Sequence, residues 1–153
     1  MDWETKYQEA MQELLRRTEG EQDLIANLSN ASAILNQWME GINWVGFYLY
    51  KEDQLVLGPF QGRPACVRIQ IGSGVCGTAF SRNETLVVAD VHEFPGHIAC
   101  DDRSRSEIVV PIRKEGRPIA VLDIDSPVLK RFGDLDREGL EEFAGLLETV
   151  CAW

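Results

Sequence analysis

The sequence lacks an apolar run long enough to span a membrane, and it lacks the charged and then apolar N-terminal segment of a secretory signal. It is also poor in positive charge, since 15 Lys and Arg stand against 25 Asp and Glu, for a formal charge of -10. That balance repels nucleic acid and anionic lipid and leaves no basic stripe for a phosphate backbone. We expect a soluble, cytoplasmic protein that binds neither nucleic acid nor membranes.

The sequence contains no internal repeat, low-complexity tract or linker. Its 153 residues, of which 44% are hydrophobic, have the length of one ordinary domain and supply enough apolar material for a core. We therefore expect a single domain over residues 1–153.

The few cysteines of the sequence limit the kinds of metal or redox site that it can form. The four cysteines are Cys66, Cys76, Cys100 and Cys151. They fit no zinc-ribbon spacing. In a reducing compartment we interpret them as free or redox-active thiols and not as a framework of structural disulfides. A metal on His92, His97, Cys100 and Asp101 is conceivable, but their spacing matches no standard zinc site, so we expect no metal.

The hydrophobic pattern indicates helices at both ends of the chain and strands between them. The predicted helices cover residues 3–17, 23–39 and 134–150, with Asp134 as the N-cap of the last. The predicted strands cover residues 43–50, 55–60, 67–71, 86–89, 107–112 and 119–124, with a short helix ending near Arg82. This order predicts an α+β fold in which N- and C-terminal helices back one face of an antiparallel sheet.

One loop, residues 94–101, presents a thiol among polar and turn-forming residues. No helical or strand period runs through the stretch from Asp90 to Ser104, so Cys100 is not ordinary core filling. A partly exposed, easily ionised Cys is a nucleophile, whereas a buried one is inert. Cys100 is thus either a reactive thiol or a structural one, and both interpretations stay open.

Strand alternation places five notable side chains on the sheet face away from those helices. They are Trp44, Tyr48, Glu107, Asp123 and Asp125. If the second hairpin closes through the three residues 114–116, Glu107 lies opposite Asp123, and a cation or a shared proton must compensate. The face is either solvated, as is usual, or a ligand pocket with aromatic walls.

Residues 72–77 formally match the glycine fingerprint of dinucleotide-binding proteins. We interpret these glycines as turn residues, because the fold lacks the β-α-β alternation that such a site needs. Cys76 lies in the first turn of the short helix, where the helix dipole would lower its pKa. Cys151 ends the last helix, where core packing explains it.

The runs 74–79, 91–101 and 106–111 closely resemble the free methionine-(R)-sulfoxide reductases, which are GAF-domain enzymes, and the similarity covers nearly the whole chain. This resemblance implies reduction of free methionine-(R)-sulfoxide, with thioredoxin as the reductant. It matches Cys100 to the catalytic thiol, and Cys66 and Cys76 to the cysteines of disulfide resolution, without deciding which resolves first. It matches the five face residues to the substrate pocket, implies a homodimer, and gives Cys151 no role.

The chemistry of sulfoxide reduction agrees with that assignment. A thiolate must attack sulfur while the departing oxygen is protonated. Three neighbouring carboxyl groups cannot all ionise cheaply, so one can stay protonated as the donor, and we count Glu107 with the catalytic cysteines. The resulting sulfenic acid condenses with a second thiol to a disulfide, which an external dithiol reduces, and no metal or organic cofactor is required.

Two other functions remain in view. A sensory GAF module would bind a small molecule without turnover, although it is normally joined to an output domain. A thiol peroxidase or redox sensor would use Cys100 without needing the acidic pocket.

Overall fold

A computed structural model describes residues 3–97 and 100–153 of the chain, so Ile98 and Ala99 of the thiol loop lie outside the described residues. The helices are α1 (Trp3–Thr18), α2 (Leu24–Trp38), α3 (Gly74–Arg82), α4 (Asp134–Val150) and the short 3-10 helix η1 (Val91–Glu93). The strands are β1 (Trp44–Lys51), β2 (Gln54–Gln61), β3 (Arg68–Gln70), β4 (Leu86–Val88), β5 (Ser106–Lys114) and β6 (Arg117–Ser126). Among the described residues, no helix is both long and apolar enough to cross a membrane.

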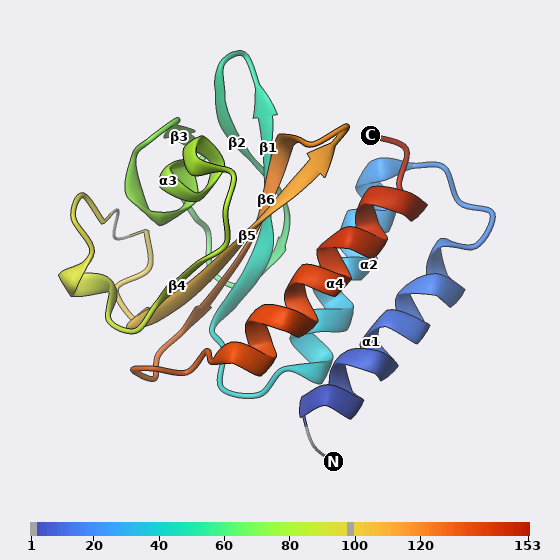
Figure 1. Cartoon of the computed structure of the whole chain (residues 1–153), viewed down its shortest axis with the longest axis horizontal. Helices are drawn as coiled ribbons and strands as arrows, with labels where there is room; N and C mark the ends of the chain where they lie inside the picture. The colour runs from blue at the N-terminus through green and yellow to red at the C-terminus, as the bar shows by residue number, and fades with distance from the viewer. Residues whose placement is uncertain (1–2, 98–99) are drawn as a thin grey trace.

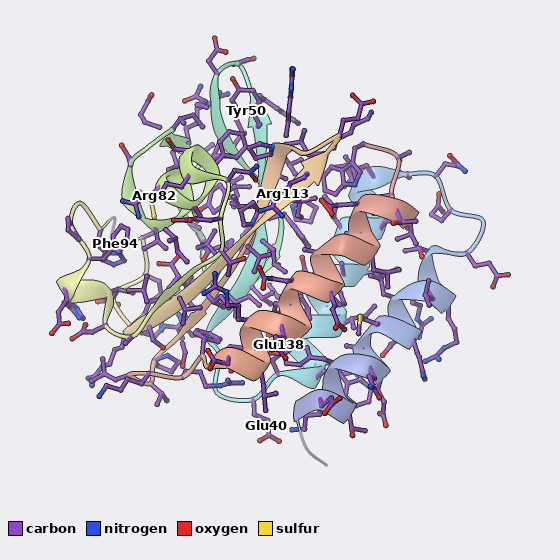
Figure 2. The ribbon with its side chains drawn as sticks, in the orientation of Figure 1. Glu40, Tyr50, Arg82, Phe94, Arg113 and Glu138 are labelled. Carbon is purple, nitrogen blue, oxygen red and sulfur yellow. A yellow bond between two sulfur atoms is a disulfide. The ribbon has the colours of Figure 1, made fainter. Side chains whose placement is uncertain are left out.

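The six strands form one antiparallel sheet in the order β3-β2-β1-β6-β5-β4. Helices α1, α2 and α4 lie together on one face, and α3 lies on the other with the segment that follows β4 (Figure 1). Side chains fill both layers, with Arg82 and Phe94 on the α3 side and Glu138 on the side of α4 (Figure 2). The predicted α+β architecture is confirmed.

The larger core lies between the sheet and the three helices. Alternate residues of the central strands, among them Phe47, Ile108 and Leu122, point into it and are fully buried. Each such side chain contributes roughly 1.5–3 kcal/mol by leaving water. The face that strand alternation assigned to the helices is therefore the one that meets them.

Hydrogen bonds at the helix N-termini fix where α2 and α4 begin. The carboxylate of Asp23 accepts a hydrogen bond of 2.8 Å from the Ala26 backbone N–H. Helix α4 starts at Asp134, but its N-cap is Gly133, whose N–H donates to Asp136 at 2.9 Å. The prediction of Asp134 as the N-cap is wrong by one residue, because the Asp136 carboxylate satisfies this end of the helix from inside its first turn.

The register of β5 and β6 differs from the predicted one. The hairpin turns on two residues, Glu115 and Gly116, both in the left-handed region with φ of 55° and 79°, and a bulge interrupts the ladder further along. Consequently Glu107 lies opposite Asp125, and Asp123 lies opposite a valine. The predicted pairing of Glu107 with Asp123 is wrong, since the shorter turn and the bulge together shift the partner by two residues.

The glycines of residues 72–77 make a tight turn into α3. The Gly72 N–H donates to the Gly77 carbonyl at 2.9 Å, and a Cβ on Gly77 would lie 2.4 Å from the Gln70 carbonyl oxygen. A side chain at this position has no room, so the close backbone approach explains the glycine. Helix α3 follows this turn and packs against β5 and β6 on the acidic face of the sheet.

Candidate active site

A cavity lies between the sheet and α3, bounded by the loops before β3 and after η1. All the predicted site residues line it except Cys66, which is bonded to one of them. Its free space is about 540 Å³, counting the part open to solvent. Trp44 and Tyr48 are each 2% exposed and Glu107 and Asp123 each 6% exposed, so the interpretation of this face as merely solvated is wrong.

Two of the cysteines form a disulfide at the cavity. Cys66, in the irregular segment before β3, is bonded to Cys100 with a Cα–Cα distance of 5.7 Å. The disulfide lies on the α3 side of the sheet (Figure 2). Cys76 and Cys151 are free thiols and both are buried. Cys151 packs into the core between the helices and the sheet, on the face opposite the cavity. The structure thus brings Cys66, Cys76 and Cys100 together and leaves Cys151 apart.

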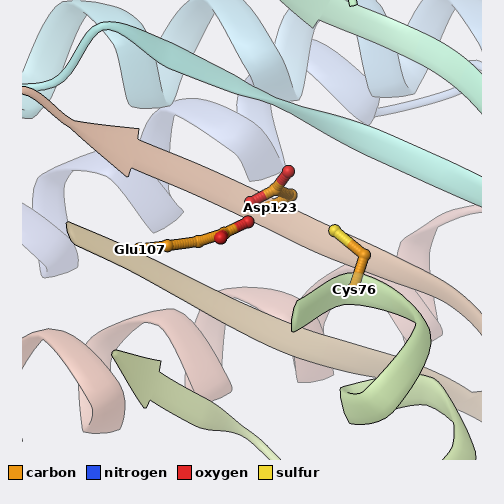
Figure 3. A group of neighbouring side chains, drawn as sticks. All are labelled: Cys76, Glu107 and Asp123. Atoms are coloured by element: carbon orange, nitrogen blue, oxygen red, sulfur yellow. The ribbon is translucent and has the colours of Figure 1, made fainter. Parts of the chain in front are cut away.

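The carboxyl groups of Glu107, Asp123 and Asp125 interact with one another in the cavity. Glu107, Asp123 and Cys76 place one side-chain oxygen or sulfur each within 4.8 Å of the others, and the two carboxyl groups point toward one another (Figure 3). Burial and the neighbouring Asp123 raise the pKa of Glu107 and of Asp125 well above the ordinary range. Burial also raises the pKa of Asp123, but the hydrogen bonds it accepts from Glu107, Cys76 and Asp125 oppose that rise.

Burial and mutual repulsion therefore disfavour the ionisation of all three carboxyl groups together. The raised pKa favours the protonated form of Glu107, which can act as a proton donor. One buried oxygen of Asp123, Oδ1, has no hydrogen-bond partner within the described part of the chain. A ligand that brings a donor would satisfy this oxygen.

Cys76 does not behave as its place in the first turn of α3 suggested. Burial and the charges of Asp123 and Glu107 raise the pKa of its thiol well above the ordinary value. The prediction of a lowered pKa is wrong, because a helix dipole acts weakly against the complete desolvation of a thiolate beside carboxylates. Cys76 is therefore a protonated donor to Asp123 and not a ready thiolate.

The two aromatic residues of β1 close the far side of the cavity. Trp44 stacks between Tyr48 and Phe60, with ring centroids 5.9 Å and 5.2 Å away. The indole Nε1 of Trp44 donates to the Arg63 carbonyl at 3.1 Å, and the Tyr48 hydroxyl donates to the Cys66 carbonyl at 3.0 Å. The aromatic walls thus also contact the segment that carries Cys66.

Sequence reasoning missed a polar cluster at the other end of the disulfide. Asp101 accepts hydrogen bonds from the Arg103 guanidinium, at 2.8 Å from Nη2, and from Nδ2 of Asn43 at 3.1 Å. The same Asn43 nitrogen donates to the Ser104 hydroxyl at 3.1 Å. Arg103 holds the pKa of Asp101 well below its usual range. The pattern Asp-x-Arg was a local signal for the ion pair, but the contact with Asn43 joins residues 58 apart in sequence.

Three of the four residues considered as metal ligands are engaged with separate partners. Cys100 is in the disulfide, Asp101 pairs with Arg103, and His92 lies 3.0 Å from Asp90. Within the described residues, the group whose atoms lie close enough to hold one ion is Cys76, Glu107 and Asp123. A thiol and two carboxyl groups would suit a divalent transition metal, but these are the groups that share protons in the cavity.

The chain is similar to known proteins along nearly its whole length. The GAF domain family matches residues 2–150. The free methionine-R-sulfoxide reductase of Escherichia coli strain K12 is 54% identical over 133 residues, which make up 87% of this chain and 81% of that protein.

Two solved structures share the fold closely. One is the fRMsr of Staphylococcus aureus in its reduced form, with a TM-score of 0.92, 55% identity and 95% of each chain covered. The other is the free methionine-R-sulfoxide reductase of Neisseria meningitidis in complex with its substrate, with a TM-score of 0.94 and 46% identity. That comparison covers 98% of this chain and 90% of the other.

Proposed function

The chain belongs to the GAF domain family and, within it, to the free methionine-R-sulfoxide reductases, and from this premise we propose that it reduces free methionine-(R)-sulfoxide to methionine. The observation that carries the proposal is the Cys66–Cys100 disulfide beside a cavity with buried, proton-sharing carboxyl groups. A redox-active thiol pair and a protonated acid are the two parts that sulfoxide reduction requires.

Cys100 is the nucleophile. Its thiolate attacks the sulfoxide sulfur while a proton from Glu107 neutralises the departing oxygen. The sulfur is reduced to the thioether of methionine, and the oxygen is transferred to Cys100 as a sulfenic acid. Burial and the neighbouring Asp123 raise the pKa of Glu107 well above its ordinary value, which favours the protonated donor.

Cys66 resolves the sulfenic acid. Its thiolate attacks the Cys100 sulfur, the hydroxyl oxygen takes up a proton from solvent and leaves as water, and the disulfide seen in the structure forms. An external dithiol then attacks that disulfide, returns both thiols, and leaves as its own disulfide. Cys76, the other matched cysteine, is hydrogen-bonded to the carboxyl cluster and has a raised pKa, so it is slower to react.

The cavity also recognises the side chain and the ammonium group of the free amino acid. Trp44 and Tyr48 wall the sulfur and its methyl group, and the acidic side chains receive the ammonium. Hydrogen bonds that Asp123 accepts from Glu107, Cys76 and Asp125 favour its ionised form. The buried Oδ1 of Asp123 gains the donor that it otherwise lacks.

The remaining partners follow from the resemblance. Thioredoxin is the expected reductant, since it supplies a dithiol to an accessible disulfide. The cytoplasm is the expected compartment, because a reducing environment is needed to recycle the pair. We also expect residues 1–153 to act as one domain and the protein to be a homodimer, which sedimentation would test.

Incubation with each epimer of free methionine sulfoxide and dithiothreitol tests the function. Methionine should form from the R epimer, and a single equivalent of substrate without dithiol should yield the Cys66–Cys100 disulfide by peptide mapping. Binding without turnover would instead identify a sensory module. Consumption of peroxide but not of sulfoxide would identify a thiol peroxidase.

A further inference from the structure

We propose that β1 and the residue just before it position both cysteines of the redox disulfide, with Tyr48 of β1 holding the segment around Cys66 (the Cys66 arm) and Asn43 holding the segment around Cys100 (the Cys100 arm). Both act as positioning residues, because neither needs to touch the sulfur atoms to do this. The proposal concerns the disulfide itself and can be tested without methionine sulfoxide.

The Cys66 arm has little regular structure of its own. Cys66 lies between β2 and β3, and the hydrogen bond that fixes its carbonyl comes from the Tyr48 hydroxyl at 3.0 Å. The Trp44 indole fixes the same segment three residues earlier, at the Arg63 carbonyl. Tyr48 is buried, and burial together with Asp123 raises the pKa of its hydroxyl, so it remains a neutral donor.

The Cys100 arm is held through the neighbouring residue. Asn43 Nδ2 donates to Asp101 and to Ser104, each at 3.1 Å, and so ties both ends of this turn to the sheet. Asn43 is itself anchored, because its backbone N–H donates to the Asp125 carbonyl at 2.9 Å. Arg103 stiffens the turn by donating to Asp101 from its backbone N–H at 3.0 Å and from its guanidinium.

These contacts have a specific consequence for the thiols. When the disulfide is reduced, nothing covalent keeps Cys66 near Cys100, and the two arms are separated by 34 residues of chain. One anchor on β1 and one on the residue just before it keep the thiols facing each other and raise their effective concentration. Residues 43–48, which include the aromatic wall of the cavity, thereby also hold Cys66 in place to attack the sulfenic acid on Cys100.

The test measures the equilibrium between the disulfide and dithiothreitol, in which the disulfide gains two electrons and the dithiol becomes a cyclic disulfide. Tyr48→Phe keeps the ring and removes only the hydroxyl, and Asn43→Ala removes the amide. We expect Tyr48→Phe to lower the equilibrium constant for disulfide formation by about 5- to 10-fold, the effect of one lost hydrogen bond. Asn43→Ala loses two hydrogen bonds and should lower it by at least as much. A tenfold change corresponds to about 30 mV. Tyr50→Phe is the matched control, because its hydroxyl lies on the same strand but bonds Asp53.

A second measurement separates positioning from general loosening. The two variants and Tyr50→Phe are each treated with one equivalent of hydrogen peroxide, which oxidises Cys100 to the sulfenic acid. With the same Tm as Tyr50→Phe, the two variants should show more dimedone adduct and slower disulfide formation. Equilibrium constants within twofold of the control for both variants would overturn the proposal. Failure of the protein to reduce methionine sulfoxide would leave this result untouched and would refute only the proposed function.

Discussion

Glu107 and Asp125 lie directly opposite each other in the β5–β6 pair. Like charges at such a position destabilise a sheet, and here both side chains are covered by α3 and the thiol loop in the same cavity. Protonation removes the conflict, and burial raises the pKa of both groups accordingly. The pairing of these two strands therefore favours a protonated carboxyl group in the cavity beside the Cys66–Cys100 disulfide.

Replacing Cys100 by serine should abolish turnover and leave the fold intact. A hydroxyl is far less acidic than a thiol and far less nucleophilic toward sulfur. Methionine formation and circular dichroism measure the two effects. Cys151→Ser is the control and should retain turnover, because Cys151 packs in the helical core. Near-normal methionine production by Cys100→Ser would refute the assignment of the nucleophile.

Replacing Glu107 by glutamine should lower kcat by about 10²- to 10⁴-fold, the usual contribution of a general acid. The amide keeps the shape of the side chain but cannot give up a proton as the oxygen departs. The rate of the first turnover, followed by methionine release, isolates this step from recycling. A kcat within a few-fold of the unmodified protein would place the proton donor elsewhere.

The free energy of unfolding should fall as pH rises above about 4.5, the ordinary pKa of a glutamate. The folded pKa of Glu107 is raised, so the folded protein holds a proton that the unfolded chain has lost, and that stabilisation disappears as pH approaches the folded pKa. Each such proton contributes a slope of about 1.4 kcal/mol per pH unit. Urea unfolding from about pH 5 to about pH 8 should show a shallower fall in Glu107→Gln, and an identical slope would contradict the shared proton.

Asp101 acts in the opposite direction and at lower pH. Its pKa is lowered by Arg103 from an ordinary 3.8, so its stabilisation is present above that pH and is lost as pH falls further. The two effects therefore occupy separate ranges of a pH titration.

The enzyme should prefer free methionine sulfoxide to the N-acetylated compound. Acetylation removes the ammonium charge and leaves a buried carboxylate without its partner. A charge-assisted hydrogen bond of this kind is worth about 1.5–3 kcal/mol, which corresponds to about 10- to 150-fold in kcat/KM. Equal kcat/KM values for the two substrates would mean that the acidic face does not read the amino group.

Replacing Gly46 by alanine should destabilise the protein by about 1–3 kcal/mol, as overpacking does, and weaken substrate binding. The new Cβ would lie 2.3 Å from Phe60 Cβ and 2.8 Å from the Trp44 ring, so it would displace the aromatic wall. Urea unfolding and KM measure these effects. Gly145→Ala is the matched control, since its Cβ meets nothing within 4 Å, and in a helix it should stabilise by about 0.5–1 kcal/mol.

The sequence by itself determined the secondary structure, the helix-covered face and the position of the thiol loop. These properties follow from local periodicity, because alternation along the central strands separates Phe47 and its neighbours from Trp44 and Tyr48 whatever the rest of the chain does. The residues of the acidic face could be predicted from the sequence for the same reason.

Tertiary structure decided which partners those residues have. A two-residue turn and a bulge set Asp125, and not Asp123, opposite Glu107. The burial of Cys76 under α3 outweighed the helix dipole, and the disulfide formed with Cys66, although the sequence left Cys66 and Cys76 equally open. The contact of Asn43 with Asp101 was equally out of reach. The environments of Cys66, Cys76 and Asn43 depend on residues distant in sequence and on desolvation, which no local pattern encodes.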